Sequence, residues 1–255
     1  MKIYRYNRNN KRGYGILEQE SLLPVEGSIF RSINTRNERI PISEVILLPP
    51  VNPTKIIAVG TNYKNHAAEM GKGLPEEPLI FLKPPSAVVG PNDIIIYPEM
   101  AKRVDYEGEL ALVIKKKARL LDEEARVEDY ILGYTCFNDV TARDLQQKDG
   151  QFTRAKSFDT FAAVGPCIAT QVDPSGLRLK TFVNGKLRQS ASTRNLIFPV
   201  PFLVRFISSI MTLYPGDIIT TGTPAGVGPL RAGDRIDIQI EGIGTLSNTV
   251  MKIKS

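Results

Sequence analysis

The sequence has 255 residues, of which 42% are hydrophobic and 24% charged, an ordinary globular composition that argues against intrinsic disorder. Its 33 basic and 27 acidic side chains leave a net charge of +6, but the two signs are interspersed, so charge alone does not indicate a nucleic-acid partner. Two cysteines cannot form a disulfide framework, and with a single histidine they are no zinc signature.

No segment has the character of a signal peptide or a membrane span. The basic start of the chain alternates polar and apolar residues, and apolar stretches such as ELALVI are only as long as a strand. We therefore expect a cytoplasmic protein without a membrane partner.

The first fifty residues predict a small β-rich unit. Short runs such as KIYRY alternate polar and apolar side chains and are separated by turn-like segments. The proline-rich stretch 49–53 is the best candidate for a boundary between this unit and the rest of the chain.

After this boundary, KIIAVG predicts a buried strand that leads into a short helix. Thr61 or Asn62 can cap this helix, which carries His66 and Glu69. The next loop, 71–78, is rich in Gly and Pro and has the composition of a lid. Further strands are predicted for PLIFLK, DIIIYP and the long run VDYEGELALVI.

The second half of the chain is expected to contain many strands and few helices. Residues 121–131 predict a helix with acidic residues in its first turn, and 198–213 predict a longer one. GYTCFNDV predicts a strand, followed by a short helix that ends at Gly150. Together these elements predict a mixed α/β, β-rich fold.

Glu107 and Glu109 lie two residues apart in a predicted strand, so their carboxylates share one face. Gly108 between them allows another group to approach the backbone closely. On a buried strand the two charges repel unless protons or a hard cation such as Mg²⁺ or Mn²⁺ neutralise them, whereas on an exposed edge both are solvated. Asp139, which ends an apolar strand, can add a third carboxylate to a metal site or can cap the next helix.

His66 and Glu69 stand three residues apart, so on a helix the carboxylate can orient the imidazole as a base that activates water. A single histidine can equally be structural. Lys156 lies beside apolar residues and can stabilise an enolate oxygen, or it can pair with Asp159 at the surface.

Arg143 and Gln146 share one face of a predicted helix and can hold substrate oxygens, although both can also be ordinary surface residues. The glycine-rich turn 221–228 contains Thr223, and its amides can cradle a carboxylate. This turn lacks the Gly-Lys-Ser/Thr ending of a nucleotide-binding loop.

In their order along the chain, these motifs resemble the fumarylacetoacetate hydrolase family: VGTNYKNHAAE, FLKPPSAVVGPNDIIIYP, RVDYEGELALVI, GYTCFNDVTARDLQ, AKSFDTFAAVGP and PGDIITTGTPAGVG. The similarity covers about residues 54–253 and leaves 1–50 as a variable N-terminal part. It implies the β-rich fold of the family's C-terminal domain with a small N-terminal β appendage, assembled as a homodimer. One departure is Ala163, where the family often has proline.

The resemblance also implies roles for individual residues and one Mg²⁺ or Mn²⁺ ion per subunit. The metal ligands of the family correspond to Glu107, Glu109 and Asp139. The catalytic residues correspond to His66, Glu69 and Lys156, and the residues that line the substrate pocket correspond to Arg143, Gln146 and Thr223.

The implied reaction is hydrolysis of a C–C bond in a 2-oxo acid that bears a second carbonyl, of the acylpyruvate or fumarylpyruvate type, through a metal-stabilised enolate. The same residues support an isomerase, tautomerase or decarboxylase acting on related 2-oxo or 2-hydroxydienoic diacids or oxaloacetate. A non-catalytic binding protein of the same fold is a further alternative. In each case we expect a small-molecule 2-oxo acid as the partner, and no nucleic acid.

Overall fold

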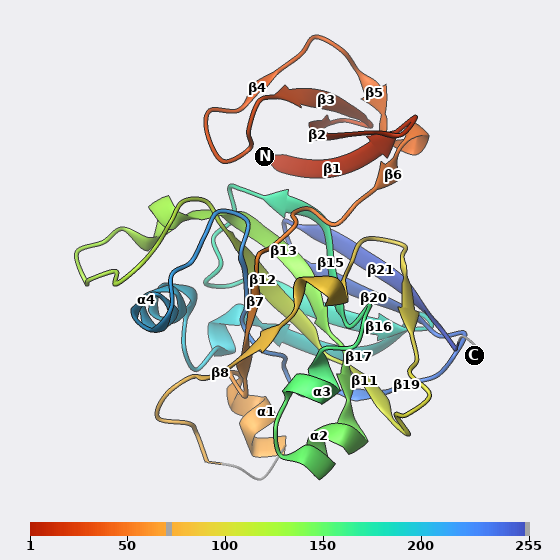
Figure 1. Cartoon of the computed structure of the whole chain (residues 1–255), viewed down its shortest axis with the longest axis vertical. Helices are drawn as coiled ribbons and strands as arrows, with labels where there is room; N and C mark the ends of the chain where they lie inside the picture. Colours follow the sequence, from red (N-terminus) through yellow and green to blue (C-terminus); the bar gives the residue numbers. More distant parts are fainter. Residues whose placement is uncertain (70–72, 253–255) are drawn as a thin grey trace.

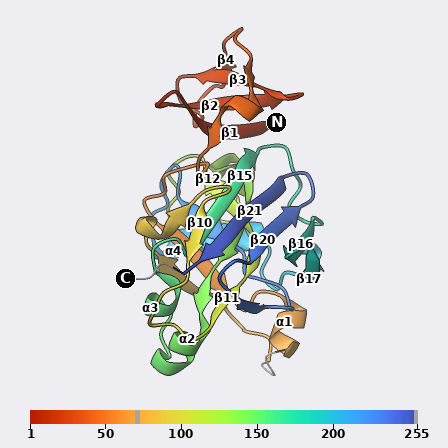
Figure 2. The same cartoon turned by 90° about the vertical axis from the view of Figure 1, so that its right-hand side faces the viewer.

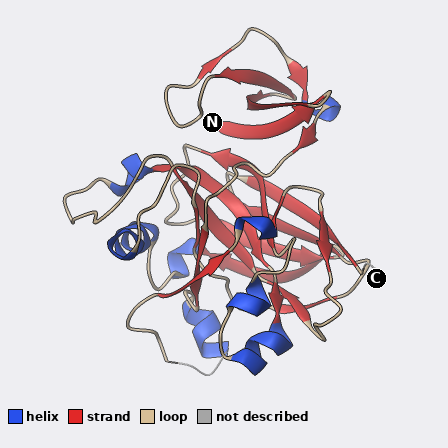
Figure 3. Cartoon of the chain, in the orientation of Figure 1, coloured by secondary structure: helices blue, strands red, loops and turns tan. Residues whose placement is uncertain are grey.

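The computed structural model describes residues 1–69 and 73–252, and strands dominate it (Figure 1, Figure 3). Strands hold 44% of the residues against 15% in helices, which confirms the predicted β-rich mixed fold. None of the helices in this part of the chain is long and apolar enough to cross a membrane. The α-helices are α1 (Lys64–Glu69), α2 (Arg143–Asp149), α3 (Thr153–Lys156) and α4 (Val200–Ile210).

The N-terminal strands form a small antiparallel unit at one end of the molecule (Figure 1, Figure 2). A tight turn at Asn9 and Asn10, with positive φ angles of 52° and 61°, joins its first two strands as a two-residue hairpin requires. Ile3 pairs with Ile168 and thereby connects the unit to the main sheet. The strands are β1 (Lys2–Arg8), β2 (Lys11–Glu18), β3 (Ser21–Glu26), β4 (Asn34–Thr35), β5 (Ile40–Pro41) and β6 (Ile46–Leu47).

The central sheet continues from this unit in the order β1-β15-β13-β12-β18-β7-β8. Its middle strands are buried along almost their whole length, as their unbroken apolar runs predict. The strands are β7 (Ile56–Gly60), β8 (Leu79–Lys83), β12 (Gly108–Ile114), β13 (Ile131–Asp139), β15 (Ala162–Ala169) and β18 (Ile218–Thr220), with β9 (Val88–Val89) beside β15.

A second sheet packs against β12, β13 and β15, and its strands alternate buried and polar positions. Its hairpin turns at Asn184 and Gly185, which both have the positive φ that a two-residue hairpin turn of this type requires. The sheet consists of β10 (Ile94–Ile96), β16 (Arg178–Val183), β17 (Lys186–Ser192), β20 (Arg235–Ile240) and β21 (Gly244–Met251). A short third sheet consists of β11 (Val104–Tyr106), β14 (Thr141–Ala142) and β19 (Gly228–Leu230).

Helices α1, α2 and α3 lie at the end of the molecule opposite the N-terminal unit in both views (Figure 1, Figure 2). From β13 the chain continues through the short strand β14 into α2, and β12 begins beside the end of β13, where Gly108 pairs with Asn138. The start of β12 and the end of β13 therefore lie side by side at the helical end of the molecule.

The predicted helix at 121–131 is wrong, because only a 3₁₀ turn at Val127–Tyr130 forms there. Arg205 of α4 donates hydrogen bonds to three carbonyls within 122–125, so these groups are satisfied outside a helix. The segment also lacks an apolar stripe with helical period that could pack against the core. The longer helix predicted within 198–213 is confirmed as α4.

Candidate metal centre and active site

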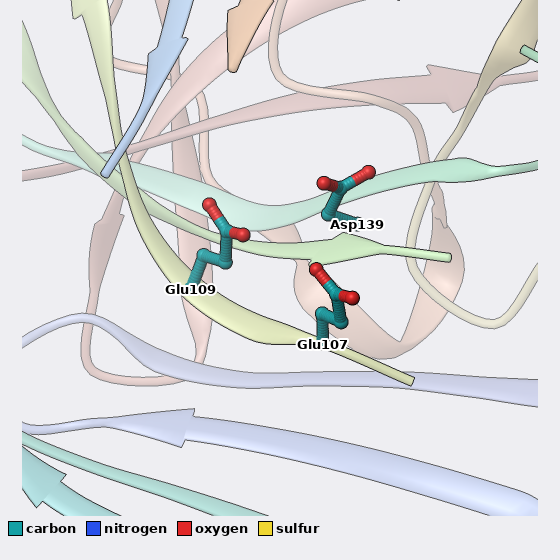
Figure 4. A group of neighbouring side chains, drawn as sticks. All are labelled: Glu107, Glu109 and Asp139. Atoms are coloured by element: carbon teal, nitrogen blue, oxygen red, sulfur yellow. The ribbon is translucent and has the colours of Figure 1, made fainter. Parts of the chain in front are cut away.

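Three carboxylates face the same space where β12 begins and β13 ends (Figure 4). Glu109 lies on β12, Glu107 immediately precedes it, and Asp139 is the last residue of β13. One oxygen from each lies within 4.8 Å of the others, and all three residues are buried. The structure thus brings the three predicted residues together and excludes the alternative of a solvated sheet edge.

Glu107, Glu109 and Asp139 are called the acidic triad below. Lys156 of α3 bridges two of its members, Glu107 and Asp139. Its ammonium donates to Glu107 Oε2 at 2.9 Å and to Asp139 Oδ2 at 2.6 Å. At 3% exposure it is not the surface lysine of the alternative interpretation. Asp139 is correspondingly a partner of lysine rather than the cap of α2, whose N-cap residue is Ala142 without a side-chain cap.

Arg143 of α2 connects the triad to a second layer of polar groups. Its guanidinium donates to the carboxylate of Glu107, to Asp105 Oδ2 at 2.9 Å and to Gln146 Oε1 at 2.5 Å. Asp105 is fully buried, and the neighbouring carboxylates keep the pKa of Arg143 raised despite its burial. Arg143 and Gln146 are therefore organised as one unit on α2.

Lys83 is a third basic residue of the cluster, and the sequence reasoning missed it. It ends β8, is 1% exposed and donates to Asp139 Oδ1 at 2.5 Å and to the Val140 carbonyl at 3.4 Å. Burial lowers its pKa. The available signal was a lysine that closes the otherwise apolar run PLIFL, because a lysine is rarely buried unless it is paired.

Burial and charge shift the pKa values of the two glutamates in opposite directions. Burial, followed by the charges of Asp139 and Glu107, raises the pKa of Glu109 well above its ordinary value. Burial also opposes ionisation of Glu107, but the charges of Lys156 and Arg143 prevail and lower its pKa to about 2. Glu109 is therefore the triad member whose charge the chain compensates least.

The donor set fits a divalent cation. It consists of three carboxylate oxygens, the hard ligands that Mg²⁺ and Mn²⁺ prefer, and their mutual spacing of at most 4.8 Å is compatible with a shared ion. A cation would compensate the charge of Glu109, which forms no ion pair with a basic side chain in the described part of the chain. Three protein ligands would also leave coordination positions for water or substrate.

Gly108 allows a tight contact behind the triad, as expected from the sequence, and the chain itself fills that space. A Cβ atom at this position would lie 2.2 Å from Thr181 Oγ1. Gln189 accepts from the Gly108 amide at 3.0 Å and donates to Thr223 Oγ1 at 2.8 Å, while the Thr223 hydroxyl donates to the Gly108 carbonyl at 3.0 Å. Gln189 was not predicted from the sequence, because a glutamine in a hairpin strand carries no local signal of this role.

A cavity of about 230 Å³ opens beside the triad. Its charged lining includes the triad and Lys156, and its apolar wall includes Phe81 and Phe152, whose rings meet edge to face at 5.1 Å. Its lining also includes the three predicted substrate-binding residues, Arg143, Gln146 and Thr223. The cavity combines the acidic triad, a positively charged wall and an apolar wall, which suits a small anionic molecule.

Helix α1 lies beside the glycine-rich turn 221–228, because the Gly226 amide donates to the Glu69 carboxylate at 3.3 Å. His66 belongs to α1, but its side chain lies outside the part of the chain that the structure describes. The pairing of His66 with Glu69 therefore stays a prediction. The lid expected at 71–78 also falls partly outside the described residues.

Comparison with protein-family models divides the chain into two matched parts. Residues 55–251 match the family described as fumarylacetoacetate (FAA) hydrolase C-terminal, and residues 1–50 match a family described as Rv2993c-like, N-terminal. The oxaloacetate tautomerase YisK of Bacillus subtilis is 46% identical over 224 residues, which cover 82% of this chain and 74% of YisK.

Solved structures agree with this relationship over the whole length of the chain. The 2-hydroxyhepta-2,4-diene-1,7-dioate isomerase from Mycobacterium marinum has a TM-score of 0.93 at 43% identity, with 100% of both chains covered. The maleylpyruvate hydrolase from Sphingobium sp. SYK-6 has a TM-score of 0.83 at 33% identity and covers 99% of this chain and 100% of its own. This chain therefore belongs to the fumarylacetoacetate hydrolase family.

Proposed function

We propose that this protein is a divalent-metal-dependent enzyme that interconverts the enol and keto forms of a 2-oxo acid, as a tautomerase or isomerase. The observation that carries the proposal is the buried acidic triad with Lys156 at the wall of a small cavity. The reactions named for two similar proteins, an oxaloacetate tautomerase and a dienedioate isomerase, support it.

Glu107, Glu109 and Asp139 would hold one Mg²⁺ or Mn²⁺ ion per chain, which when bound polarises a carbonyl and stabilises negative charge on its oxygen. Lys156, whose pKa is raised because its two carboxylate partners outweigh its burial, would donate a hydrogen bond to that oxygen. The positive charge of Lys156 is then in place before the enolate forms, so little reorganisation is needed during the reaction.

The α2 residues Arg143 and Gln146 would bind the carboxylate of the substrate, because a guanidinium and a carboxylate match in geometry and charge. Ketonisation removes the proton from the enol oxygen and delivers a proton to the adjacent carbon. His66, oriented by Glu69, is our candidate for the group that carries this proton.

Hydrolysis of a C–C bond is the second candidate function, and the structural similarity to a maleylpyruvate hydrolase favours it. In this reaction His66 would take a proton from water, whose oxygen attacks the distal carbonyl. The C–C bond then breaks, its electron pair remains on the 2-oxo fragment as an enolate, and a proton completes the product.

The two reactions are distinguished by product analysis with Mn²⁺ and two substrates, oxaloacetate and an acylpyruvate. We expect faster ketonisation of enol-oxaloacetate, which is measured as the loss of the ultraviolet absorbance of the enol. We expect no release of a carboxylic acid from the acylpyruvate. Acid release with no effect on ketonisation would establish the hydrolase instead, and neither reaction in the Mn²⁺-saturated protein would contradict both.

Changing the proton carrier tests the mechanism separately. His66→Ala is expected to slow ketonisation by about 10²–10⁴-fold, the usual contribution of a general acid–base group. Full ketonisation activity in this variant would show that another group carries the proton.

A further inference from the structure

The two oxygens of Asp139 are held by two different lysines. Lys156 Nζ lies 2.6 Å from Oδ2, and Lys83 Nζ lies 2.5 Å from Oδ1. Among the described residues, the lining of the catalytic cavity includes Lys156 but not Lys83. Lys83 therefore contacts Asp139 from outside the lining of this cavity, and it lines a neighbouring cavity instead.

We propose that Lys83 is a positioning residue, which fixes Oδ1 of Asp139 so that Oδ2 alone is presented to the divalent cation. The inference rests on the proposed function, because it assigns a role within the metal site. A carboxylate can rotate about its Cβ–Cγ bond, and a hydrogen bond to the far oxygen limits that rotation. Hydrogen bonds of this kind commonly orient carboxylates that bind metals.

The placement of Lys83 is itself rigid, which positioning requires. Its backbone pairs with Ile56 in the ladder between β7 and β8, and its ammonium also donates to the Val140 carbonyl. At 1% exposure its charge is separated from water, so the side chain has few alternatives to this pairing. Lys83 thereby couples an outer strand of the sheet to the end of β13.

Lys55 provides a matched control. It is also a lysine paired with a buried aspartate, Asp217, but this aspartate is neither part of the triad nor in the lining of the catalytic cavity. Asp217 is held in addition by the backbone amides of Thr54, Lys55 and Tyr214, so this pair is structural. Loss of either lysine removes one partner of a buried carboxylate, but only Lys83 contacts the triad.

The test is calorimetric titration of Mn²⁺ into metal-stripped full-length protein carrying Lys83→Met or Lys55→Met. We expect the Kd for Mn²⁺ to rise by about 10–100-fold in Lys83→Met, as is typical when a group that orients a metal ligand is lost. Lys55→Met should lower the Tm and leave the Kd unchanged. An unchanged Kd in Lys83→Met would overturn the proposal, and so would tighter binding, because then the charge of Lys83 only repels the cation.

Two further measurements keep the proposal testable if Lys83→Met does not fold. Lys83→Gln retains a hydrogen-bond donor, and its Kd should lie between those of the wild type and Lys83→Met. In a crystal structure of the wild-type protein with Mn²⁺, Asp139 should bind the ion through Oδ2 alone, and bidentate binding would contradict the inference. If the wild type does not bind Mn²⁺, the proposed function is overturned together with this inference. If the wild type and Lys83→Met bind Mn²⁺ with the same Kd, only this inference is overturned.

Discussion

Among the triad residues, Glu109 is the one whose ionisation the folded protein opposes most strongly. It is 1% exposed, lies beside two other carboxylates and accepts a hydrogen bond from the Gly222 amide at 2.8 Å. Because the pKa of Glu109 is raised in the folded state, the unfolded chain loses the proton of this carboxyl group at a lower pH than the folded chain does. The stability of the metal-free protein should therefore decrease as the pH rises above 4.5, the ordinary pKa of this side chain.

Replacing Glu109 by the neutral Gln should remove this cost. We expect metal-free Glu109→Gln to have a higher Tm than the wild type at pH 7, by about 2–4 °C for each kcal/mol gained. The Tm is measured in EDTA between pH 5 and 8. With Mn²⁺ added, the wild type should have the higher Tm of the two proteins, because only the wild type retains the full triad. A metal-free variant that is less stable than the wild type across this pH range would contradict the assignment.

Glu107 predicts the opposite dependence on pH. Its pKa is lowered to about 2, so the stabilisation from its ion pairs is complete above the ordinary value of 4.5 and is lost as the pH falls toward 2. We expect Glu107→Gln to weaken this acid-side loss of stability in chemical denaturation measured between pH 2 and 5. An identical acid-side profile in the variant and the wild type would show that these ion pairs contribute nothing to stability.

Gln146 tests the binding of the substrate carboxylate. Its Oε1 accepts from Arg143 at 2.5 Å, and both residues line the cavity. We expect Gln146→Ala to raise the KM for a 2-oxo acid by about tenfold, or about 1.4 kcal/mol, and to leave the Kd for Mn²⁺ unchanged. Gln151→Ala, outside the lining of this cavity, is the control. A decrease in kcat with unchanged KM would place Gln146 in the chemical step instead.

Among the elements, the segment 104–114 differs from the single long strand that the sequence predicts, because it forms two strands. The structure has β11 in the third sheet and β12 in the central sheet, with Glu107 at the crossing between them. Side chains satisfy the backbone there, since Asn138 accepts from the Glu107 amide and Gln189 from the Gly108 amide. These partners come from distant elements, so the run DYEGELALVI gives no local sign of the break.

The close contact at Gly108 leaves no room for a side chain between the two glutamates. A Cβ atom would lie 2.2 Å from Thr181 Oγ1, so we expect Gly108→Ala to cost about 1–3 kcal/mol and to weaken Mn²⁺ binding, because the flanking glutamates must move. Thermal unfolding and Mn²⁺ titration measure both effects. Gly176→Ala, where the nearest atom is 3.6 Å away, is the control, and equal Tm values for the two variants would contradict the prediction.

At the scale of the whole molecule, the sequence allowed prediction of what depends on local pattern or on family motifs. Alternation and apolar runs predicted the β-rich fold, and the E-x-E spacing led to Glu107 and Glu109. Residues whose role depends on distant partners could not be found in this way. Asn62, a candidate helix cap, instead binds the backbone of Phe198 and Thr221, and Lys83 acts on a residue 56 positions away.

The homodimer implied by the family resemblance stays a prediction for the whole molecule. Light scattering coupled to size-exclusion chromatography should give twice the chain mass of 28.3 kDa at micromolar concentration. A mass equal to that of one chain under these conditions would contradict it.

Calorimetric titration of Mn²⁺ into the metal-stripped protein tests most directly whether the acidic triad binds a divalent cation. We predict one ion per chain, and a Kd that rises by at least about 100-fold in Asp139→Asn, because a carboxylate ligand of a hard cation is lost. Absence of saturable binding by the wild type, or an unchanged Kd in Asp139→Asn, would show that the triad is not a binding site for this ion.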